Sequence, residues 1–413
     1  MFGKHYICKN YKYMIPFSPP RIDEETVKEV TEALMSGWIT TGPRTKQFEK
    51  EITAYVGCET TVCVNSWTNG MQVLLDWWGI GAGDEVILPA YTYCASGNVV
   101  LHSGAKLILV DIDSKDFNAS VTAIEKAMSP RTKAIVPVDI GGFPCDYDEI
   151  IQLAEEMRST FQPNNELQQK LGRPIVIADA AHSFGALYGG QRVGRVADIT
   201  VFSFHAVKNL TTAEGGAICF QLPDSFDHET IYKEFCVKIL HGQSKDALAK
   251  TKKGAWKYDV VEPGFKCNMT DIQAAIGLVE LRRYPSNLKR RAEIFELYTT
   301  AFSKCNWAEL PVYKTPLKES SYHLYQIRIR DIDEATRDAI VESVAERGVA
   351  VNVHFQPLPL LTAYKRRDFN ISDYPIALER YSNEISLPVY YDLTDDQVNT
   401  VIDAVVLAVE ELT

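Results

Sequence analysis

Between residues 85 and 181, short apolar runs alternate with amphipathic stretches that have helical spacing. The runs are EVILPA, KLILVDI, KAIVPVD and PIVIADAA, and the helical stretches include VTAIEKAM and DYDEIIQLAEEM. This alternation is typical of a mostly parallel sheet covered by helices on both faces, so an α/β fold is predicted. Two further apolar runs, ITVFSFH and GGAICF, bracket a polar turn at 206–214. The polar segment 158–172 is expected to be a surface insertion.

Helical periodicity also marks the chain before residue 85. Val27, Val30 and Leu34 are spaced to bury one stripe of a helix that ends at Gly37. A second helix is predicted from about Thr68. The apolar positions on its buried face are Met71, Leu74, Leu75 and Trp78.

The pattern changes after residue 263, where no further parallel-sheet rhythm is found. A long helix is predicted from Thr270, and Pro285 is expected to kink or interrupt it. A strand at 322–329, a helix at 333–347, a strand at 349–355 and a helix at 394–412 are expected to follow. The predicted units are an N-terminal arm (residues 1–20), a large cofactor-binding domain (21–275) and a small C-terminal α+β domain (276–413).

Composition and charge narrow the classes of function. The 413 residues are 46% hydrophobic, which is typical of a globular protein. The formal net charge of −11 argues against a protein that binds nucleic acid mainly through contacts with phosphates. No run approaches the roughly 18 apolar residues of a membrane span, so no integral membrane contact is expected. The nine cysteines include no C-x-x-C pair, and the charged first residues are unlike a signal peptide. Reduced thiols and a cytoplasmic location are predicted.

Several familiar motifs are missing from the sequence. The eight histidines have no zinc-ligand spacing, so no metal is expected. Neither the G-x-x-x-x-G-K-[ST] phosphate loop nor the G-x-S-x-G nucleophile elbow occurs, which disfavours nucleotide triphosphate and serine-hydrolase chemistry.

The strongest chemical signal is a lysine paired with an acid. Lys208 lies in the polar turn between two predicted strands, and Asp179 ends another predicted strand. Ligands of open α/β sheets bind beyond the carboxyl ends of strands, so both side chains are expected to face one crevice. Pyridoxal phosphate needs a lysine amine to form a Schiff base and a carboxylate to keep the pyridine nitrogen protonated. A lysine alone would more simply be a surface residue; the pair points to pyridoxal phosphate.

A phosphate site is predicted at the start of the second helix, where Ser66, Thr68 and Asn69 lie. Free backbone N–H groups and the helix dipole favour an anion there, although an ordinary helix cap explains the same residues. Ser203, five residues before Lys208, could add a hydroxyl group.

Aromatic candidates for packing on the cofactor ring follow another predicted strand. Of Tyr91 and Tyr93, the second is preferred, and a core tyrosine is the alternative. His182 could hydrogen-bond the ring hydroxyl oxygen or stack on the ring. A histidine satisfied within the core is the simpler interpretation of that residue taken alone.

Five blocks in this order resemble the DegT/DnrJ/StrS-type sugar aminotransferases. They are SGWITTGP (36–43), GAGDEVILPAYTY (81–93), ADAAHSFGA (178–186), FSFHAVKNLTTAEGG (202–216) and PGFKCNMTDIQAAIG (263–277). The resemblance spans nearly the whole chain and implies a fold type I pyridoxal-phosphate enzyme. It implies that Lys208 forms the Schiff base, Asp179 meets the pyridine nitrogen and His182 lies by the ring oxygen. The residues it implies for the phosphate are Thr68, Asn69 and Ser203.

The resemblance also implies a homodimer in which the loop 264–269 reaches the neighbouring active site. Members often have G-x-N-x-R-M in this loop, whereas this chain has Lys266 in place of the asparagine and Asn268 in place of the arginine. Lys266 is therefore the candidate for contact with the neighbour's cofactor, and whether it makes that contact is left open. Trp67 stands where many members have a small residue, so its ring is expected to reshape the pocket. The substrate-binding candidates are Trp38, Thr41 and His354.

The residues of these blocks most resemble the branch of the family that aminates C4 of UDP-linked 4-keto sugars. The predicted function is transfer of an amino group from glutamate to a UDP-4-keto-6-deoxy-hexose or N-acetylhexosamine for surface polysaccharide biosynthesis. A UDP-4-keto-pentose is the alternative substrate. A dehydratase on the same scaffold would have histidine in place of Lys208, and a non-catalytic regulator is the rival of a different class.

Overall fold

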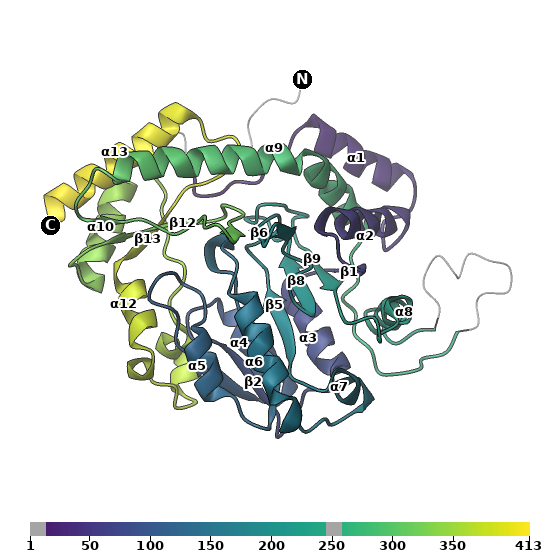
Figure 1. The fold of residues 1–413 in the computed structure, drawn as a ribbon. Helices are drawn as coiled ribbons and strands as arrows, with labels where there is room; N and C mark the ends of the chain where they lie inside the picture. The colour runs from purple at the N-terminus through teal and green to yellow at the C-terminus, as the bar shows by residue number, and fades with distance from the viewer. Residues whose placement is uncertain (1–13, 245–257) are drawn as a thin grey trace.

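The computed structural model describes residues 14–244 and 258–413, so the first 13 residues of the predicted arm lie outside the described residues. The strands of the large sheet are β1 (Thr60–Val64), β2 (Glu85–Pro89), β3 (Lys106–Val110), β4 (Thr132–Ile135), β5 (Ile175–Asp179), β8 (Ile199–Ser203) and β9 (Gly216–Phe220). Their spatial order is β1-β9-β8-β5-β4-β2-β3 (Figure 1). Only β9 runs against its neighbours in this sheet, so the predicted, mostly parallel α/β sheet is confirmed.

Helices cover both faces of this sheet, which explains why its strands are apolar along their whole length. They are α2 (Pro43–Val56), α3 (Trp67–Trp77), α4 (Cys94–Ser103), α5 (Val121–Ala127), α6 (Tyr147–Glu156), α7 (Glu166–Leu171) and α8 (His228–Lys238). Successive residues of β5 face opposite layers: Ile175 and Ile177 lie in a core with α3, α4 and α8, whereas Val176 lies in a core with α5 and α6.

A second sheet forms the smaller part of the molecule. Its strands are β10 (Ala308–Glu309), β12 (Tyr325–Ile329) and β13 (Glu384–Leu387), all antiparallel. Further helices are α10 (Glu334–Glu346), α11 (Thr362–Lys365), α12 (Pro375–Asn383) and α13 (Asp395–Leu412), and the short strands β6 (Leu187–Tyr188), β7 (Gln191–Arg192) and β11 (Lys318–Glu319) form a third sheet. Residues of β12, β13, α10 and α13 share one hydrophobic core.

The long helix α9 (Asp271–Phe302) joins the two parts and runs along one side of the molecule (Figure 1). Its Ala274 and Leu278 pack in a core of the large sheet, and its Ile294 and Phe295 pack in the core of the small sheet. Pro285 lies inside α9 without ending it, so an interruption, one of the two predicted effects, is wrong, and a kink at Pro285 stays a prediction. A side chain–backbone capping box at Thr270 defines the start of α9.

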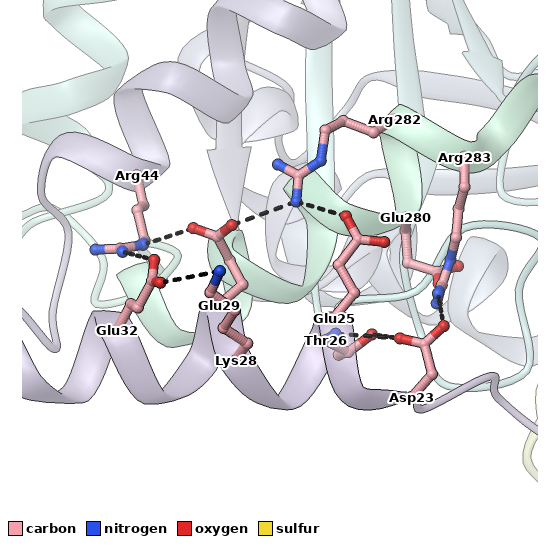
Figure 2. Close-up of polar contacts among 10 residues, drawn as sticks. All are labelled: Asp23, Glu25, Thr26, Lys28, Glu29, Glu32, Arg44, Glu280, Arg282 and Arg283. Carbon is pink, nitrogen blue, oxygen red and sulfur yellow. Dashed lines mark hydrogen bonds and ion pairs between the residues drawn. The ribbon is translucent and has the colours of Figure 1, made fainter.

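Helix α1 (Glu24–Met35) is present as predicted, but it faces the other way. Val27 and Leu34 are 57% and 51% exposed, whereas Thr26 and Ala33 are buried. Figure 2 shows why: the side of α1 that meets α9 and α2 carries acids that pair with Arg282, Arg283 and Arg44. The apolar stripe therefore points away from the core, and the predicted buried face is wrong.

Three other local predictions differ from the structure. Residues 349–355 form isolated bridges at Val349 and Asn352 instead of a strand. The segment 158–172 contains α7, which buries Gln168 and Leu171, so it is more than a surface insertion. The sequence pattern also missed α2 and β1.

None of the helices in the described ranges 14–244 and 258–413 is long and apolar enough to cross a membrane.

Candidate active site

A cavity of about 320 Å³ lies where β1, β5 and β8 end. Asp179 is the last residue of β5, Ser203 is the last residue of β8, and Ser66 follows β1 by two residues. β5 and β8 are neighbours in the sheet, with Asp179 paired to Val201, so the turn after β8 brings Lys208 to the same cavity as Asp179. The predicted meeting of these two side chains at the carboxyl edge of the sheet is what the fold produces.

Burial pulls the pKa values of the amine and the acid toward each other. Loss of water around Lys208 lowers its pKa to about 8, and the nearby Asp179 opposes this shift. Burial raises the pKa of Asp179 to about 7, opposed by a hydrogen bond from Ser96, by the N–H of Ala181 and by Lys208. Both groups therefore titrate near neutral pH, which suits groups that bind and release protons.

Ser96 is a contact that the sequence did not reveal. Its hydroxyl donates to Asp179 Oδ2 at 2.7 Å and lies 3.1 Å from the Thr92 hydroxyl. Ser96 is buried in the first turn of α4, which begins directly after Tyr93. A hydrogen bond to a carboxylate favours the ionised form, so Ser96 helps Asp179 to remain charged.

His182 and His323 lie side by side in the cavity wall, with ring centroids 4.4 Å apart. The N–H of Gly141 donates to His182 Nδ1 at 3.3 Å, so the proton of a neutral His182 is on Nε2. Burial, and next the charge of Lys208, hold the pKa of His182 well below its ordinary value. His182 therefore offers one N–H donor.

His323 offers the opposite chemistry. The Asn209 amide donates from Nδ2 to the Ser321 carbonyl, which directs Asn209 Oδ1 toward His323 Nδ1 at 2.8 Å. His323 Nδ1 therefore carries the proton and Nε2 is an acceptor. Burial, and next the neighbouring His182, lower the pKa of His323 well below its ordinary value. His323 was not predicted as a site residue, because a histidine inside the predicted strand 322–329 gives no signal of its own.

The start of α3 lines the cavity as expected. Ser66 caps the helix by accepting from the N–H of Asn69 at 3.1 Å, and Thr68 and Trp67 line the wall. The side chain of Asn69 instead donates to Asn65 Oδ1 at 2.8 Å, and Asn69 is not part of the cavity wall. Its role at the phosphate thus remains a prediction. Trp67 is 6% exposed, and its Nε1 has no hydrogen-bond partner within the described part of the chain.

Aromatic side chains line part of the cavity wall. Tyr93 is 59% exposed and lies 5.7 Å from the ring of Phe355, and both residues line the wall. His354 lines the same wall and stacks on Phe17 at 5.3 Å. Phe17 belongs to the part of the predicted N-terminal arm that is described. Ser18 donates to the carbonyl of Val207, which attaches this segment beside the lysine turn.

The other predicted contacts lie outside this cavity. Thr41 donates to the carbonyl of Met269 and accepts from Asn268 Nδ2, both at 2.6 Å, near the start of α9. Lys266 is exposed and donates to Asn268. Trp38 is half-buried near the same helix start. A single chain thus brings together Lys208, Asp179, His182, Thr68, Tyr93, Ser203 and His354, but not Lys266, Trp38 or Thr41.

The residues present fit pyridoxal phosphate. Lys208 supplies an amine with a lowered pKa, which suits a Schiff base. Asp179 supplies a carboxyl group, which suits a protonated ring nitrogen. The N-terminal end of α3, with the hydroxyl of Thr68, suits a phosphate. The size of the cavity is within the range of small-molecule sites.

The fold and this set of side chains define a pyridoxal-phosphate enzyme of fold type I, as the sequence predicted. The model of the DegT/DnrJ/EryC1/StrS aminotransferase family matches residues 20–406, and the chain belongs to this family. The putative sugar aminotransferase Spr1654 of Streptococcus pneumoniae is similar in its PMP form, with 44% identity, a TM-score of 0.94 and coverage of 97% of this chain and 100% of that chain. Its PLP form is 43% identical with a TM-score of 0.93, at the same coverage.

Two other relatives carry more specific names. The spore coat polysaccharide biosynthesis protein SpsC of Bacillus subtilis is 37% identical over 401 residues, which are 95% of this chain and 96% of that protein. PseC of Helicobacter pylori, an aminotransferase involved in the biosynthesis of pseudoaminic acid, is 27% identical, with a TM-score of 0.84 and coverage of 96% of this chain and 100% of that chain. The predictions of an aminotransferase and of its cofactor are confirmed.

Proposed function

We propose that this enzyme moves an amino group from glutamate to a nucleotide-linked 4-keto sugar, of the UDP-4-keto-6-deoxy-hexose or N-acetylhexosamine type. The observation that carries the proposal is the placement of Lys208 and Asp179 in one cavity at the carboxyl edge of the sheet. When bound, pyridoxal phosphate supplies an electron sink for the substrate carbon that exchanges its amine. A UDP-4-keto-pentose is the alternative acceptor.

In this function Lys208 carries protons at the reacting carbon. Its pKa of about 8 leaves a substantial neutral fraction near pH 7.5, so the amine can take a proton and return it. Lys208 is also the group that holds the cofactor covalently between reactions. The dehydratase alternative is disfavoured because it would place histidine at this position.

Asp179 and the surrounding donors would hold the cofactor in one orientation. The carboxylate, kept charged by the Ser96 hydroxyl, would bind the protonated ring nitrogen. His182 Nε2–H would donate to the ring oxygen, and Tyr93 would cover one face of the ring. The N–H groups at the start of α3, together with the Thr68 and Ser203 hydroxyls, would bind the phosphate.

The names of the relatives support a sugar as the acceptor. Spr1654 is described as a putative sugar aminotransferase, SpsC as a spore coat polysaccharide biosynthesis protein, and PseC as acting in pseudoaminic acid biosynthesis. We therefore place the reaction in the biosynthesis of a surface polysaccharide or glycan. The cysteines of the described residues are all free, which supports a cytoplasmic location.

A homodimer is the second part of the proposal. Lys208 is the only lysine or arginine that lines the cavity among the described residues, yet the phosphate and the two carboxylates of glutamate require more positive charge. The exposed apolar side chains of α1 offer a surface for self-association, with Met35 84% exposed beside Val27 and Leu34. A second copy would bring Lys266, Trp38 and Thr41 to the cavity.

Mixing two inactive variants tests this shared site. Lys208→Ala and Lys266→Ala chains, unfolded and refolded together, should recover part of the activity because a mixed dimer retains one site with both lysines. Each variant treated alone is the control. No recovery, with mixed dimers present by mass spectrometry, would contradict a shared site.

The chemistry itself is tested by separating the two halves of the reaction. Glutamate alone should convert the visible absorption of the lysine-bound cofactor to that of the PMP form, and a UDP-4-keto sugar should restore it. A non-catalytic regulator would show no conversion with glutamate. Conversion with glutamate but no reaction with any keto sugar would mean that the proposed acceptor is wrong and that glutamate is a donor.

A further inference from the structure

Glu384 is a buried carboxylate that the reaction described so far does not use. It lies at the start of β13 in the small sheet and is fully buried. Its Oε2 accepts from the backbone N–H of His354 at 3.0 Å, and its Oε1 accepts from the Ser386 hydroxyl at 2.5 Å. Glu384 therefore contacts His354 directly through the backbone and indirectly through Ser386.

The Ser386 hydroxyl links Glu384 to the ring of His354. It lies 3.0 Å from His354 Nδ1, and above the Glu384 pKa of about 8, where the carboxylate is ionised, its single hydrogen is given to Glu384. The hydroxyl must then accept from His354 Nδ1–H, which leaves a lone pair on Nε2. Asn352 Nδ2, a donor, lies 3.5 Å from Nε2 and agrees with this assignment.

The structure holds this histidine in place at the cavity wall. The carbonyl of His354 accepts from the Tyr91 hydroxyl at 2.6 Å and from Gln326 Nε2 at 2.7 Å. The ring stacks on Phe17 and lines the cavity that contains Lys208. A fixed ring with one free nitrogen can exchange a proton with a bound molecule at a defined point.

We propose that Glu384 and Ser386 are positioning residues that pass a proton to and from His354, so that His354 Nε2 exchanges a proton with an oxygen of the sugar substrate while the ring stays neutral. The inference rests on the proposed amination of a keto sugar. That reaction releases the ketone oxygen as water, and the oxygen must gain hydrogens before it leaves. A group that gives a proton and later recovers one meets this need.

The proton balance of the relay is simple. When Nε2 takes a proton from an oxygen of the bound sugar, the O–H bond there breaks, Nδ1 gives its proton to Ser386 Oγ, and Ser386 gives its own to Glu384. Three bonds to hydrogen form and three break, and the proton ends on the buried carboxylate. The reverse sequence delivers it from Nε2 to the departing oxygen. No oxidant or further reactant is involved.

The acidities of the two end groups agree with this direction of transfer. Burial, and next the charge of Lys208, lower the pKa of His354 to about 3, so its ring does not hold an extra proton near pH 7. Burial raises the pKa of Glu384 to about 8, opposed by Ser386, the His354 N–H and Arg337. Glu384 is therefore the member of the chain that stores the proton near neutral pH.

The first experiment detects the tautomer of His354 without any reaction. In Glu384→Gln the amide oxygen must face the His354 N–H, so the NH₂ group faces Ser386, which then donates to Nδ1. The ring proton should move from Nδ1 to Nε2. ¹⁵N NMR of the histidine rings at about pH 9, above the Glu384 pKa of about 8, should show this exchange, with His354→Gln used to assign the signals. Unchanged signals would overturn the proposal.

The second experiment separates the half-reactions and uses Ser386→Ala, which breaks the relay but keeps the bond from His354 N–H to Glu384. The single-turnover rate with the keto sugar should fall about 10- to 100-fold, and the rate with glutamate should not change. Equal losses in both halves would indicate a structural role and overturn the proposal. Matched controls are Ser382→Ala, whose hydroxyl bonds Leu378 in α12, and Glu342→Gln on the exposed side of α10.

The two proposals fail in different ways. If the unmodified enzyme aminates no keto sugar, the proposed function is wrong, and the ¹⁵N spectra still decide whether Glu384 controls the His354 tautomer. If the enzyme aminates a keto sugar and Ser386→Ala does so at the normal rate, the relay is wrong while the function stands.

Discussion

Two clusters of charged residues in this molecule behave in opposite ways. Around α1, acids and arginines form a chain of ion pairs in which Arg282 contacts Glu25 at 3.1 Å and Glu29 at 3.3 Å (Figure 2). Arg282 and Glu25 are 46% and 56% exposed, whereas Arg283, which pairs with Asp23, is 11% exposed. The cavity cluster consists of only two groups, Lys208 and Asp179. Both are poorly solvated, and burial shifts both pKa values toward neutrality.

The difference shows that the number of charges does not mark the active site. Exposed ion pairs gain little, because water already solvates both partners and salt screens them. A charge in a poorly solvated cavity is costly, and it is retained where its proton is exchanged. The surface cluster attaches a helix, whereas the cavity cluster carries the chemistry. Substitutions in the two clusters should therefore have very different effects.

The largest effect is expected from Lys208→Ala. Loss of the amine removes the proton carrier at the reacting carbon, so the rate of amine transfer should fall by at least about 10³-fold. The cofactor should still bind without a covalent link, which dialysis and absorption spectra would show. Lys126→Ala on α5, an exposed position away from the cavity, is the control. Near-normal turnover of Lys208→Ala would refute the mechanism.

The next largest effect is expected from Asp179→Asn. An amide cannot balance the positive charge of a protonated ring nitrogen, and a hydrogen bond to a charged group is worth about 1.5–3 kcal/mol. The rate of amine transfer should therefore fall about 10- to 100-fold. Steady-state kinetics with glutamate and a keto sugar would measure this loss. An unaffected rate would mean that Asp179 does not contact the ring.

A pH series on the cofactor-free protein sharpens the comparison further. Only the neutral amine attacks the cofactor aldehyde, so covalent capture should slow about tenfold for each pH unit below the Lys208 pKa of about 8 and level off above it. Stopped-flow absorption after mixing with pyridoxal phosphate measures this rate. A midpoint near the ordinary lysine pKa would show that the amine is as well solvated as one on the surface.

Ser96→Ala should give a smaller, pH-dependent loss. The Ser96 hydroxyl bond lowers the pKa of Asp179, so its removal should raise that pKa and leave more of the acid protonated. The rate should fall about three- to tenfold at about pH 6.5 and less at about pH 8.5, since the acid ionises again at higher pH. Equal losses at both pH values would contradict this role.

The smallest effect is expected in the surface cluster. Arg282→Ala removes two ion pairs from α1, and the free energy of unfolding should change by less than about 1 kcal/mol. The rate of amine transfer should stay the same. Urea unfolding followed by circular dichroism measures the first quantity. A large change in activity would show that the α1 cluster and the cavity are coupled.

Much of the large sheet could be predicted from local pattern alone. The apolar runs before Asp179 and before Lys208 are β5 and β8, since a strand buried on both faces needs apolar residues at every position. The face of α1 could not be predicted in the same way. The stripe of Val27 and Leu34 has the correct period for a helix, but the period does not state which side meets the core.

The same limit applies to the polar contacts of the site. Ser96 and His323 are far from Asp179 and Lys208 in the sequence, and neither has a local pattern that distinguishes it from other buried polar residues. The side chain of Asn69 bonds Asn65, and Lys266, Trp38 and Thr41 lie outside the cavity, so the roles of these residues stay predictions.

The sequence by itself determined the alternation of strands and helices, the position of the acid at the end of one strand and that of the lysine in the turn after another. These features depend on neighbours along the chain, whose spacing is fixed by covalent geometry. Only the tertiary structure decided that β5 and β8 are adjacent, that Ser96 reaches Asp179 and that Glu384 reaches His354 through Ser386. These contacts join residues distant in sequence, and their protonation depends on how much water the folded chain excludes around them.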